Sequence, residues 1–290
     1  QTKRTASGQT LLSAKARPMH APALPLIPTD LLLLAYRNGI FPMSDSRDDP
    51  EVFWVEPRRR AILPLDGFRL SKSLARTIRR GRFRVTCNAA FERVIEACSQ
   101  PRPDHPESWI SGRIMASYRA LHEAGHAHSI ECWQGEDLVG WLYGVGFDRV
   151  FCGESMFSRA DNASKVALAW LVALLRQAGF TLLDCQFMTE HLRSMGAVEI
   201  PQREYRRLVE QAQGRPRTSL GTAWRSFAEG VDYAAGAGVA AGAAAGAGAA
   251  GALGEALAAG LGVAPGAGRL ADAGSASPGQ RIAQFLTHTS

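Results

Sequence analysis

The stretch TLLDCQF at residues 181–187 places two polar side chains inside an otherwise apolar β-strand pattern. Because side chains alternate between the two faces of a strand, Asp184 and Gln186 share one face and lie roughly 7 Å apart. Leu183 and Cys185 take the other face, which we expect to pack against a helix. The spacing itself shows only that a carboxylate and an amide lie side by side. We expect that pair to face a cleft, where both groups can hydrogen-bond a bound molecule.

A second carboxylate, Glu154, lies inside the apolar strand pattern FCGESMF at residues 151–157. An apolar strand that keeps a carboxylate either pairs it in a structural ion pair or uses it in a site, and the residues alone leave both open. The loop that follows, SRADNASK, has no Gly-rich turn of the kind that wraps the pyrophosphate of a nucleotide cofactor. Its Ser, Asp and Asn residues are typical of helix capping instead.

The segment HEAGH at residues 122–126 matches the H-E-x-x-H pattern of zinc proteases. Zinc binding by this pattern needs both histidines on one face of a continuing helix and a third ligand beyond it. Gly125 is a typical helix stop, and the alternation after it indicates a strand. We therefore interpret the segment as a helix end followed by a strand start, and we predict no metal site.

Positive charges gather between residues 72 and 84 without an intervening carboxylate. Helical spacing puts the first four on one helix face, and the last two continue the positive surface onto the next strand. Such a run is commonly a solvated face, but it is also the footprint expected of a protein that binds a phosphate backbone. The residues are Lys72, Arg76, Arg79, Arg80, Arg82 and Arg84.

Two tryptophans, Trp54 and Trp109, lie in polar stretches, EVFWVEP and ESWISG. An isolated Trp is usually a core residue. Near a cleft, an exposed Trp can instead stack on a nucleotide base, and the residues alone leave both interpretations open.

The elements around these residues predict a mixed α/β fold of the α+β kind, with a largely antiparallel sheet. Three consecutive strands, HSIECW, LVGWLYGV and VFCGESMF, are expected to form a meander. A strongly apolar helix at 164–179 follows, and the 181–187 strand then lies beside the meander.

Composition divides the chain into four segments: a basic flexible arm at 1–27, a small N-terminal domain at 28–69, the main domain at 70–229, and an Ala/Gly-rich low-complexity tail at 230–290. Interspersed Gly costs about 1 kcal/mol per residue in a helix, so we expect no lasting structure in the Ala/Gly repeat. The tail is therefore excluded from the predicted fold.

The 290-residue chain carries a formal charge of +6, which allows a nucleic-acid or acidic partner without requiring one. Its five cysteines are scattered singly with no C-x-x-C spacing, so neither a disulfide framework nor a structural zinc site is indicated. No segment has the length and apolarity of a transmembrane helix. We expect a protein of the reducing cytoplasm that does not bind a membrane.

From about residue 27 to residue 205 the chain closely resembles the leucyl/phenylalanyl-tRNA–protein transferases of bacteria. The resemblance is carried by motifs that occur in order: AYRNGIFP, RVTCNAAFERVIEAC, SWI, YRALHEAGHAHSIE, LVGWLYGV, FCGESMFSRADNASK and DCQ. It implies a small N-terminal domain and a C-terminal domain of the acetyltransferase (GNAT) type.

The same resemblance implies transfer of Leu, Phe or, less readily, Met from aminoacyl-tRNA to the α-amine of proteins that begin with Arg or Lys. The product would then be degraded through the N-degron pathway. The tRNA 3′ end is the acyl donor, so aminoacyl-tRNA is a co-substrate and no cofactor is expected.

The resemblance also implies roles for individual residues. Asp184 and Gln186 match the reaction centre, and Glu154 matches a residue near the acceptor and the ester. Gln186 would accept a hydrogen bond from the attacking α-amine, oriented and polarised by Asp184.

The remaining roles concern the two ends of the aminoacyl-tRNA. The hydrophobic amino-acid pocket is matched by Met156, Phe151 and Leu142, the last standing where some members have Met. Trp54 and Trp109 match tryptophans that hold the terminal adenosine. The basic residues between Lys72 and Arg84 match the surface expected to take the tRNA acceptor stem.

Two functions of other classes remain as alternatives. A coenzyme A–dependent N-acetyltransferase on the same fold would turn over acetyl-coenzyme A. A non-catalytic tRNA-binding protein would bind charged and uncharged tRNA alike.

Overall fold

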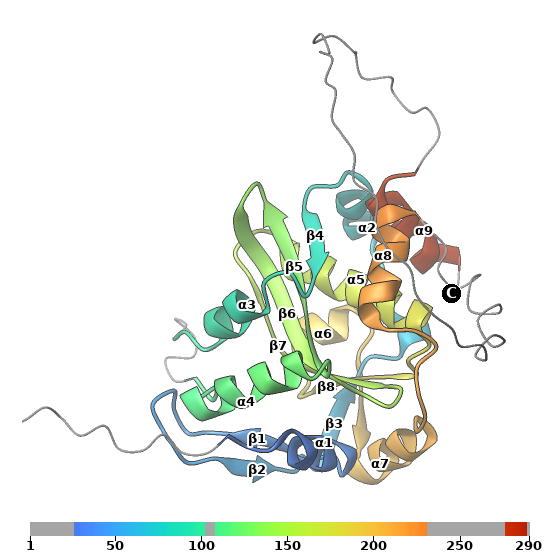
Figure 1. The fold of residues 1–290 in the computed structure, drawn as a ribbon. Helices are drawn as coiled ribbons and strands as arrows, with labels where there is room; N and C mark the ends of the chain where they lie inside the picture. The colour runs from blue at the N-terminus through green and yellow to red at the C-terminus, as the bar shows by residue number, and fades with distance from the viewer. Residues whose placement is uncertain (1–25, 102–107, 231–275, 289–290) are drawn as a thin grey trace, which may run out of the picture.

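The computed structural model describes residues 26–101, 108–230 and 276–288 (Figure 1). Most of the predicted N-terminal arm and the whole Ala/Gly repeat therefore lie outside the described residues. The last residue of the predicted arm, Ile27, is buried, and its backbone N–H donates a hydrogen bond to Ser117 Oγ over 3.0 Å. The arm prediction is therefore wrong at its end, because the chain joins the core there.

A seven-stranded mixed sheet forms the centre of the molecule, in the order β4-β5-β6-β7-β8-β3-β9. Its strands are β3 (Arg59–Ile62), β4 (Arg84–Cys87), β5 (Ala127–Gln134), β6 (Asp137–Phe147), β7 (Val150–Ser158), β8 (Leu182–Gln186) and β9 (Val198–Pro201). The strands β4, β5, β6 and β7 pair antiparallel in turn, and β5, β6 and β7 are the predicted meander. The chain then crosses through one helix, and β8 returns parallel to β7. The predicted fold class is confirmed.

The crossover helix α5 (Ala163–Ala178) packs against one face of the sheet because its apolar side chains surround it on all sides. Gly179 ends it with a left-handed backbone (φ +82°), a conformation that glycine adopts without the strain of a Cβ. On the same face lie α2 (Lys72–Arg79), α8 (Leu220–Glu229) and α9 (Pro278–His288). These helices form one hydrophobic core with α5.

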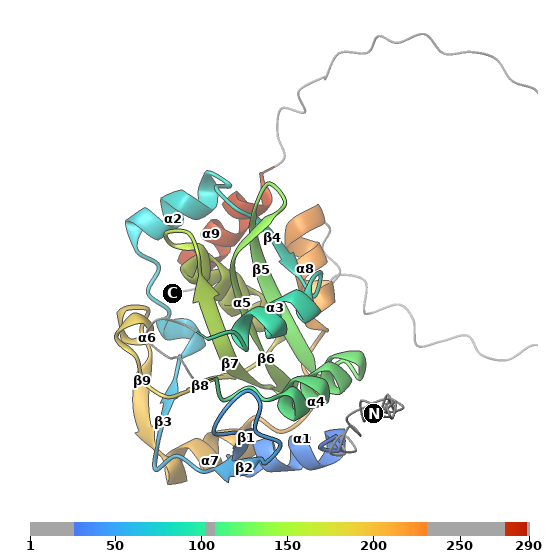
Figure 2. The ribbon, with the colours of Figure 1, turned by 90° about the vertical axis from the view of Figure 1, so that its left-hand side faces the viewer.

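Three other helices, α1 (Thr29–Arg37), α3 (Phe91–Cys98) and α4 (Gly112–Glu123), form a second core with the opposite face of the sheet. Figures 1 and 2 show α3 and α4 on the side of the sheet away from α5. The sheet is thus covered on both faces, which explains why nearly all of β6 is buried.

The N-terminal part contains α1 and a two-stranded hairpin of β1 (Phe41–Met43) and β2 (Phe53–Val55). The structure differs from the predicted N-terminal domain, residues 28–69, in the place of β3. That strand pairs with β8 and β9 inside the large sheet, and the short 3-10 helix η1 (Leu65–Gly67) follows it. The difference arises because Arg60 in β3 has a buried partner in β8, as described below.

The C-terminal part contains α6 (Glu190–Ser194), α7 (Gln202–Gln211), α8 and α9. The predicted tail, residues 230–290, is wrong for α9, which buries Ile282, Ala283 and Leu286 in the main core. Its amphipathic sequence, PGQRIAQFLTH, differs in composition from the Ala/Gly repeat that precedes it. None of the helices in the described ranges combines the length and apolarity that a membrane crossing requires.

Candidate functional site

A cavity of about 580 Å³ opens where β7 and β8 separate. The two strands pair only as far as Cys152 and Asp184, while β7 continues to Ser158. Beyond that point, the gap is closed by α5, α6, Trp109 and β1. The lining is mainly apolar and includes Phe41, Met43, Leu142, Met156, Leu168 and Phe187.

Glu154 is the carboxylate in the wall of this cavity, and it is held by two tyrosines from different helices. Tyr36 of α1 donates a hydrogen bond to Oε1 over 2.7 Å, and Tyr118 of α4 donates to Oε2 over 3.2 Å. The two tyrosine hydroxyls also contact each other. Burial raises the pKa of both tyrosines well above 10, so both keep their protons and act as donors.

Burial raises the pKa of Glu154 to about 7, although the hydrogen bonds from Tyr36 and Tyr118 work in the opposite direction. The group therefore exchanges a proton near neutral pH, which is the range in which a general base is most effective. The ion-pair alternative left open for Glu154 is wrong, because the contacts of its carboxylate are hydroxyls and no described cation forms a salt bridge with it.

Gln186 ends β8 with a left-handed backbone (φ +60°), and its side chain lines the cavity. An interaction of the Gln186 amide with the Glu154 carboxyl lowers the pKa of that carboxyl, although the contact lacks the geometry of a regular hydrogen bond. Among the residues described, its buried Nε2 has no hydrogen-bond partner. A buried amide left without a partner is costly, so its N–H groups are available to a bound molecule.

Asp184 lies in a different place from the one predicted. It is fully buried on the far side of β8, where Arg60 donates to it through Nε (2.9 Å) and Nη2 (2.6 Å). Tyr205 donates to the same carboxylate over 3.1 Å, and the Arg60 guanidinium lies over the rings of Phe41 and Tyr205. The prediction that Asp184 faces the cleft is wrong, because its carboxylate is needed to neutralise a buried arginine.

Asp184 reaches the cavity only through the backbone. Its Oδ1 accepts a hydrogen bond from the backbone N–H of Gln186 over 2.8 Å, and none from the Gln186 side chain. This contact helps to hold Gln186 in its left-handed conformation. Asp184 is therefore placed to position Gln186 and has no contact with the cavity itself.

Two of the three residues predicted to form the hydrophobic amino-acid pocket line the cavity, and the third does not. Leu142 and Met156, paired across β6 and β7, both line the cavity. Phe151 does not line it, because this residue is completely buried in the core beneath Gly144. Leu183 and Cys185 pack on the α5 side as predicted, and this side also forms part of the cavity wall.

Of the two tryptophans predicted to hold the adenosine, one lines the cavity and the other does not. Trp109 is half-buried and lines the cavity. Trp54 lies on β2 opposite Pro42, is 40% exposed and does not line the cavity. The cavity-lining residues of the hairpin are Phe41 and Met43, which alternate with Pro42 along β1, so Trp54 shares the hairpin face that points away from the cavity.

The six basic residues between Lys72 and Arg84 lie on α2, on the turn after it and at the start of β4. All six are exposed, and none forms a salt bridge with another described residue. Arg82 and Arg84 instead lie over the rings of Phe83 and Trp133. The cations therefore form a free positive surface, at the end of the molecule where α2 and β4 lie (Figure 1).

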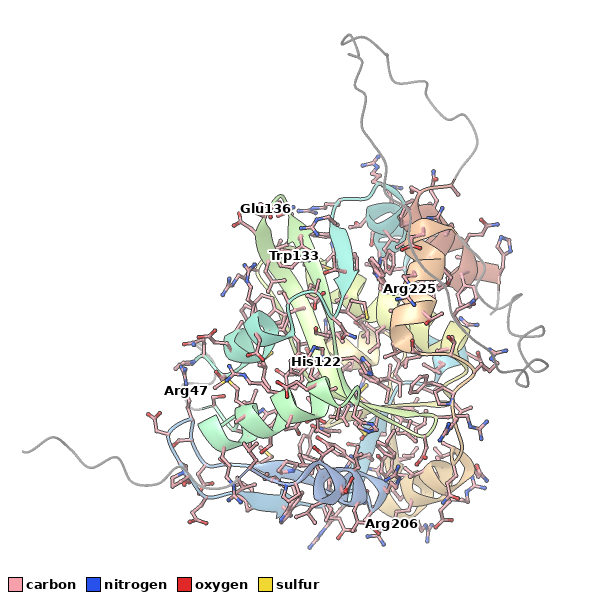
Figure 3. The ribbon with its side chains drawn as sticks, in the orientation of Figure 1. Arg47, His122, Trp133, Glu136, Arg206 and Arg225 are labelled. Carbon is pink, nitrogen blue, oxygen red and sulfur yellow. The ribbon has the colours of Figure 1, made fainter. Side chains whose placement is uncertain are left out.

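The HEAGH segment ends a helix, as predicted. The helix α4 ends at Glu123, Gly125 adopts φ +80°, and His126 lies outside the helix. His122, labelled in Figure 3, lies at the end of α4. Its ring stacks on Phe91 with ring centroids 4.1 Å apart, and its Nδ1 contacts the carbonyl oxygen of Ala127. Both contacts give this histidine a structural role.

Four residues of the site were not singled out from the sequence: Tyr36, Tyr118, Arg60 and Tyr205. Arg60 could have been found by the reasoning applied to Glu154. An arginine at the start of the apolar run AILPL is expected to be buried, and a buried charge needs a partner. Tyr36 and Tyr118 lie among buried apolar residues of their helices, where a tyrosine is indistinguishable from an ordinary core residue.

The cavity combines an apolar chamber with a carboxyl group that exchanges a proton near neutral pH, which suits an acyl-transfer enzyme. A sequence profile described as "Leucyl/phenylalanyl-tRNA protein transferase" matches residues 62–210, and that of the corresponding N-terminal domain matches residues 27–58. The chain belongs to the leucyl/phenylalanyl-tRNA–protein transferase family and is an aminoacyltransferase.

Curated relatives carry the same family name. The leucyl/phenylalanyl-tRNA–protein transferase of Novosphingobium aromaticivorans is 63% identical over 264 residues, which cover 91% of this chain and 97% of that protein. The protein of that name from Zymomonas mobilis is 58% identical over 187 residues, covering 64% of this chain and 70% of the relative. Among solved structures, L-PGS from Bacillus licheniformis matches with a TM-score of 0.31 at 13% identity, covering 57% and 55% of the two chains.

Proposed function

We propose that this chain transfers Leu, Phe or, less readily, Met from aminoacyl-tRNA to the α-amine of proteins that begin with Arg or Lys, and so marks them for degradation through the N-degron pathway. The reaction would take place in the cytoplasm, with aminoacyl-tRNA as co-substrate and no cofactor. The observation that carries the proposal is Glu154, a carboxyl group with a pKa of about 7 in the wall of an apolar cavity.

The apolar cavity is the proposed site of the donor amino acid. Leu142, Met156, Leu168 and Leu171 offer methyl and thioether groups to an apolar side chain that is not branched at Cβ, such as that of Leu, Phe or Met. A charged side chain would lose its hydration there without gaining a partner. Trp109 at the cavity and the exposed Trp54 of the β1–β2 hairpin are proposed to hold the terminal adenosine by stacking.

The acceptor amine would meet Glu154. Attack requires the unprotonated amine, and the free α-ammonium group has a pKa of about 7.7–8.0. Transfer of its proton to Glu154, with a pKa of about 7, is uphill by only about 1 kcal/mol. The amine nitrogen then forms a bond with the ester carbon, and the bond from that carbon to the ribose oxygen breaks.

Two protons leave the nitrogen during this reaction. One ends on the ribose oxygen, which departs as a hydroxyl group, and the other reaches solvent through Glu154. Gln186, whose Nε2 has no partner among the described residues, is proposed to donate a hydrogen bond to the ester carbonyl oxygen as negative charge develops on it.

The acceptor preference follows from charge. Asp184 is neutralised by Arg60, so it adds no net charge to the cavity. Glu154 is the carboxylate that remains in the lining, and it favours a positively charged N-terminal residue in the acceptor.

Discrimination among donor amino acids tests the proposed pocket. With an Arg-initiated peptide as acceptor, we expect leucyl-tRNA to react faster than valyl-tRNA by about 10- to 200-fold, since a misfit of methyl size in such a pocket is worth about 1–3 kcal/mol. Aspartyl-tRNA should give no product. The measurement is labelled amino acid recovered in the peptide, with all donors at the same concentration. Equal transfer of Leu, Val and Asp would show that the cavity does not hold the donor side chain.

A further inference from the structure

The helix α9 fills a groove beside α2 and α5 on the main core. Ile282 and Ala283 are completely buried there, and Leu286 is 3% exposed. Phe285 packs edge-on against Phe227 of α8, with ring centroids 5.2 Å apart. Ile282, Ala283 and Leu286 belong to the same hydrophobic core cluster as α5, so α9 is an integral part of the main core.

Arg281 ties α9 to the end of α8. Its Nε donates to the carbonyl oxygen of Phe227 over 2.7 Å, and its Nη2 donates to that of Ala228 over 3.0 Å. These carbonyls belong to the last turn of α8, where no intrahelical N–H is available to them. A cation at a helix C-terminus also complements the helix dipole. The attachment is therefore specific as well as hydrophobic.

The main neighbour of α9 is α2, the helix that carries three of the six exposed cations and has a fourth, Arg80, at its C-cap. The helix α2 packs mainly against α9 and to a smaller extent against α5, and Figures 1 and 2 show α2 and α9 side by side. Gly279 is so close to the backbone of α2 that a Cβ there would lie 2.1 Å from the carbonyl oxygen of Ile78. The backbones of α9 and α2 are therefore in direct contact at this point, with no room for a side chain on residue 279.

The helix α2 has little stability of its own. It has eight residues, and isolated helices of fewer than about 12–15 residues are marginal in water. Lys72, Arg76 and Arg80 repel one another at i, i+4 spacing, which destabilises a helix further. Its buried residues Leu74 and Ile78 belong to the same core cluster as Ile282 and Leu286 of α9. Packing against α9 therefore supplies much of what holds the basic helix in place.

We infer that α9 is a positioning element for tRNA: it braces α2 so that the exposed cations Lys72, Arg76, Arg79 and Arg80 meet the phosphate backbone as a preformed surface. The helix lies outside residues 62–210, which the family profile matches. The inference rests on the proposed function for the identity of the nucleic acid. It assigns a role in substrate binding to a segment far from the reaction centre in the sequence.

The test compares the full chain with a chain that ends at residue 230, using two leucyl donors. Leucyl-tRNA carries the phosphate backbone, whereas leucyl-adenosine carries only the reacting end. We expect the shortened chain to bind tRNA about tenfold more weakly or worse. The log–log salt slope of its tRNA affinity should be smaller by roughly 2 to 4, since each lost phosphate contact removes about 0.9. The rate with leucyl-adenosine should stay within about twofold. An equal loss with both donors would mean that α9 only stabilises the fold, and unchanged tRNA binding would also overturn the inference.

A point variant keeps the test valid if the shortened chain fails to fold. Gly279→Ala improves helix propensity but forces α9 and α2 apart, so we expect several-fold weaker tRNA binding at an unchanged leucyl-adenosine rate. Gly221→Ala in α8 is the matched control, because a Cβ there meets nothing closer than Ser219 Oγ at 3.9 Å. Equal tRNA affinity of the two variants would contradict the inference. Absence of leucine transfer by the full chain with either donor would instead contradict the proposed function.

Discussion

Replacement of Glu154 by Gln is expected to lower the rate of leucine transfer by about 10²- to 10⁴-fold, the usual contribution of a general base. The substitution keeps the shape of the side chain and its contacts with Tyr36 and Tyr118, but removes the site that takes the proton. Because burial raises the pKa of Glu154 to about 7, kcat/KM of the unmodified chain should rise with pH through about 7. That limb should vanish in the Gln variant, leaving only the limb set by the acceptor amine.

Loss of folding cannot account for such a result. A carboxyl group whose pKa is raised from 4.5 to about 7 contributes its stability below about pH 4.5, and the contribution is lost as the pH rises through about 7. At pH 8 the Gln variant should therefore be at least as stable as the unmodified chain.

A matched control is Glu131→Gln, since Glu131 is also fully buried and held by hydroxyls, of Thr86 and Ser129, but does not line the cavity. We expect the Glu131 variant to keep the limb near pH 7. A Glu154 variant with an unchanged profile would show that Glu154 is not the base.

Replacement of Asp184 by Ala is expected to destabilise the fold by roughly 3–5 kcal/mol, because it leaves the Arg60 guanidinium buried without its counter-charge. The free energy of unfolding in urea gives the measurement. The double variant Arg60→Met with Asp184→Leu should recover most of the loss, since well-packed apolar residues can replace a buried ion pair.

An exposed ion pair between the neighbouring strands β3 and β9 provides the control. Arg59 and Glu199 form a salt bridge at 2.6 Å with side chains 56% and 37% exposed, so Glu199→Ala should cost at most about 1 kcal/mol. If Asp184→Ala were as stable as the unmodified chain but inactive, Asp184 would act in the reaction itself and the structural role assigned to it would be wrong.

The sequence predicted the strands of the site well, because their alternation and order leave few arrangements. The meander of β5, β6 and β7 and the return of β8 were found in this way. Alternation also separated Leu183 and Cys185 from Asp184. It could not show where β7 and β8 part, which decides which face opens onto a cavity, nor the left-handed turn that brings Gln186 into it.

Contacts between distant segments were beyond prediction from the residues alone. Tyr36, Tyr118 and Glu154 come from three separate elements, and Arg60 meets Asp184 across the sheet. The helix α9 was missed for a different reason: its short amphipathic pattern follows an Ala/Gly repeat, and composition does not reveal a docking site on another helix.

The most direct test of the proposed transfer uses labelled leucyl-tRNA and two peptides that differ only in a first residue of Arg or Ala. We expect labelled leucine to appear on the α-amine of the Arg-initiated peptide at a rate at least tenfold above that of the Ala-initiated one, and not at all when the amine is acetylated. Equal labelling of both peptides, or no labelling of either, would contradict the proposed function.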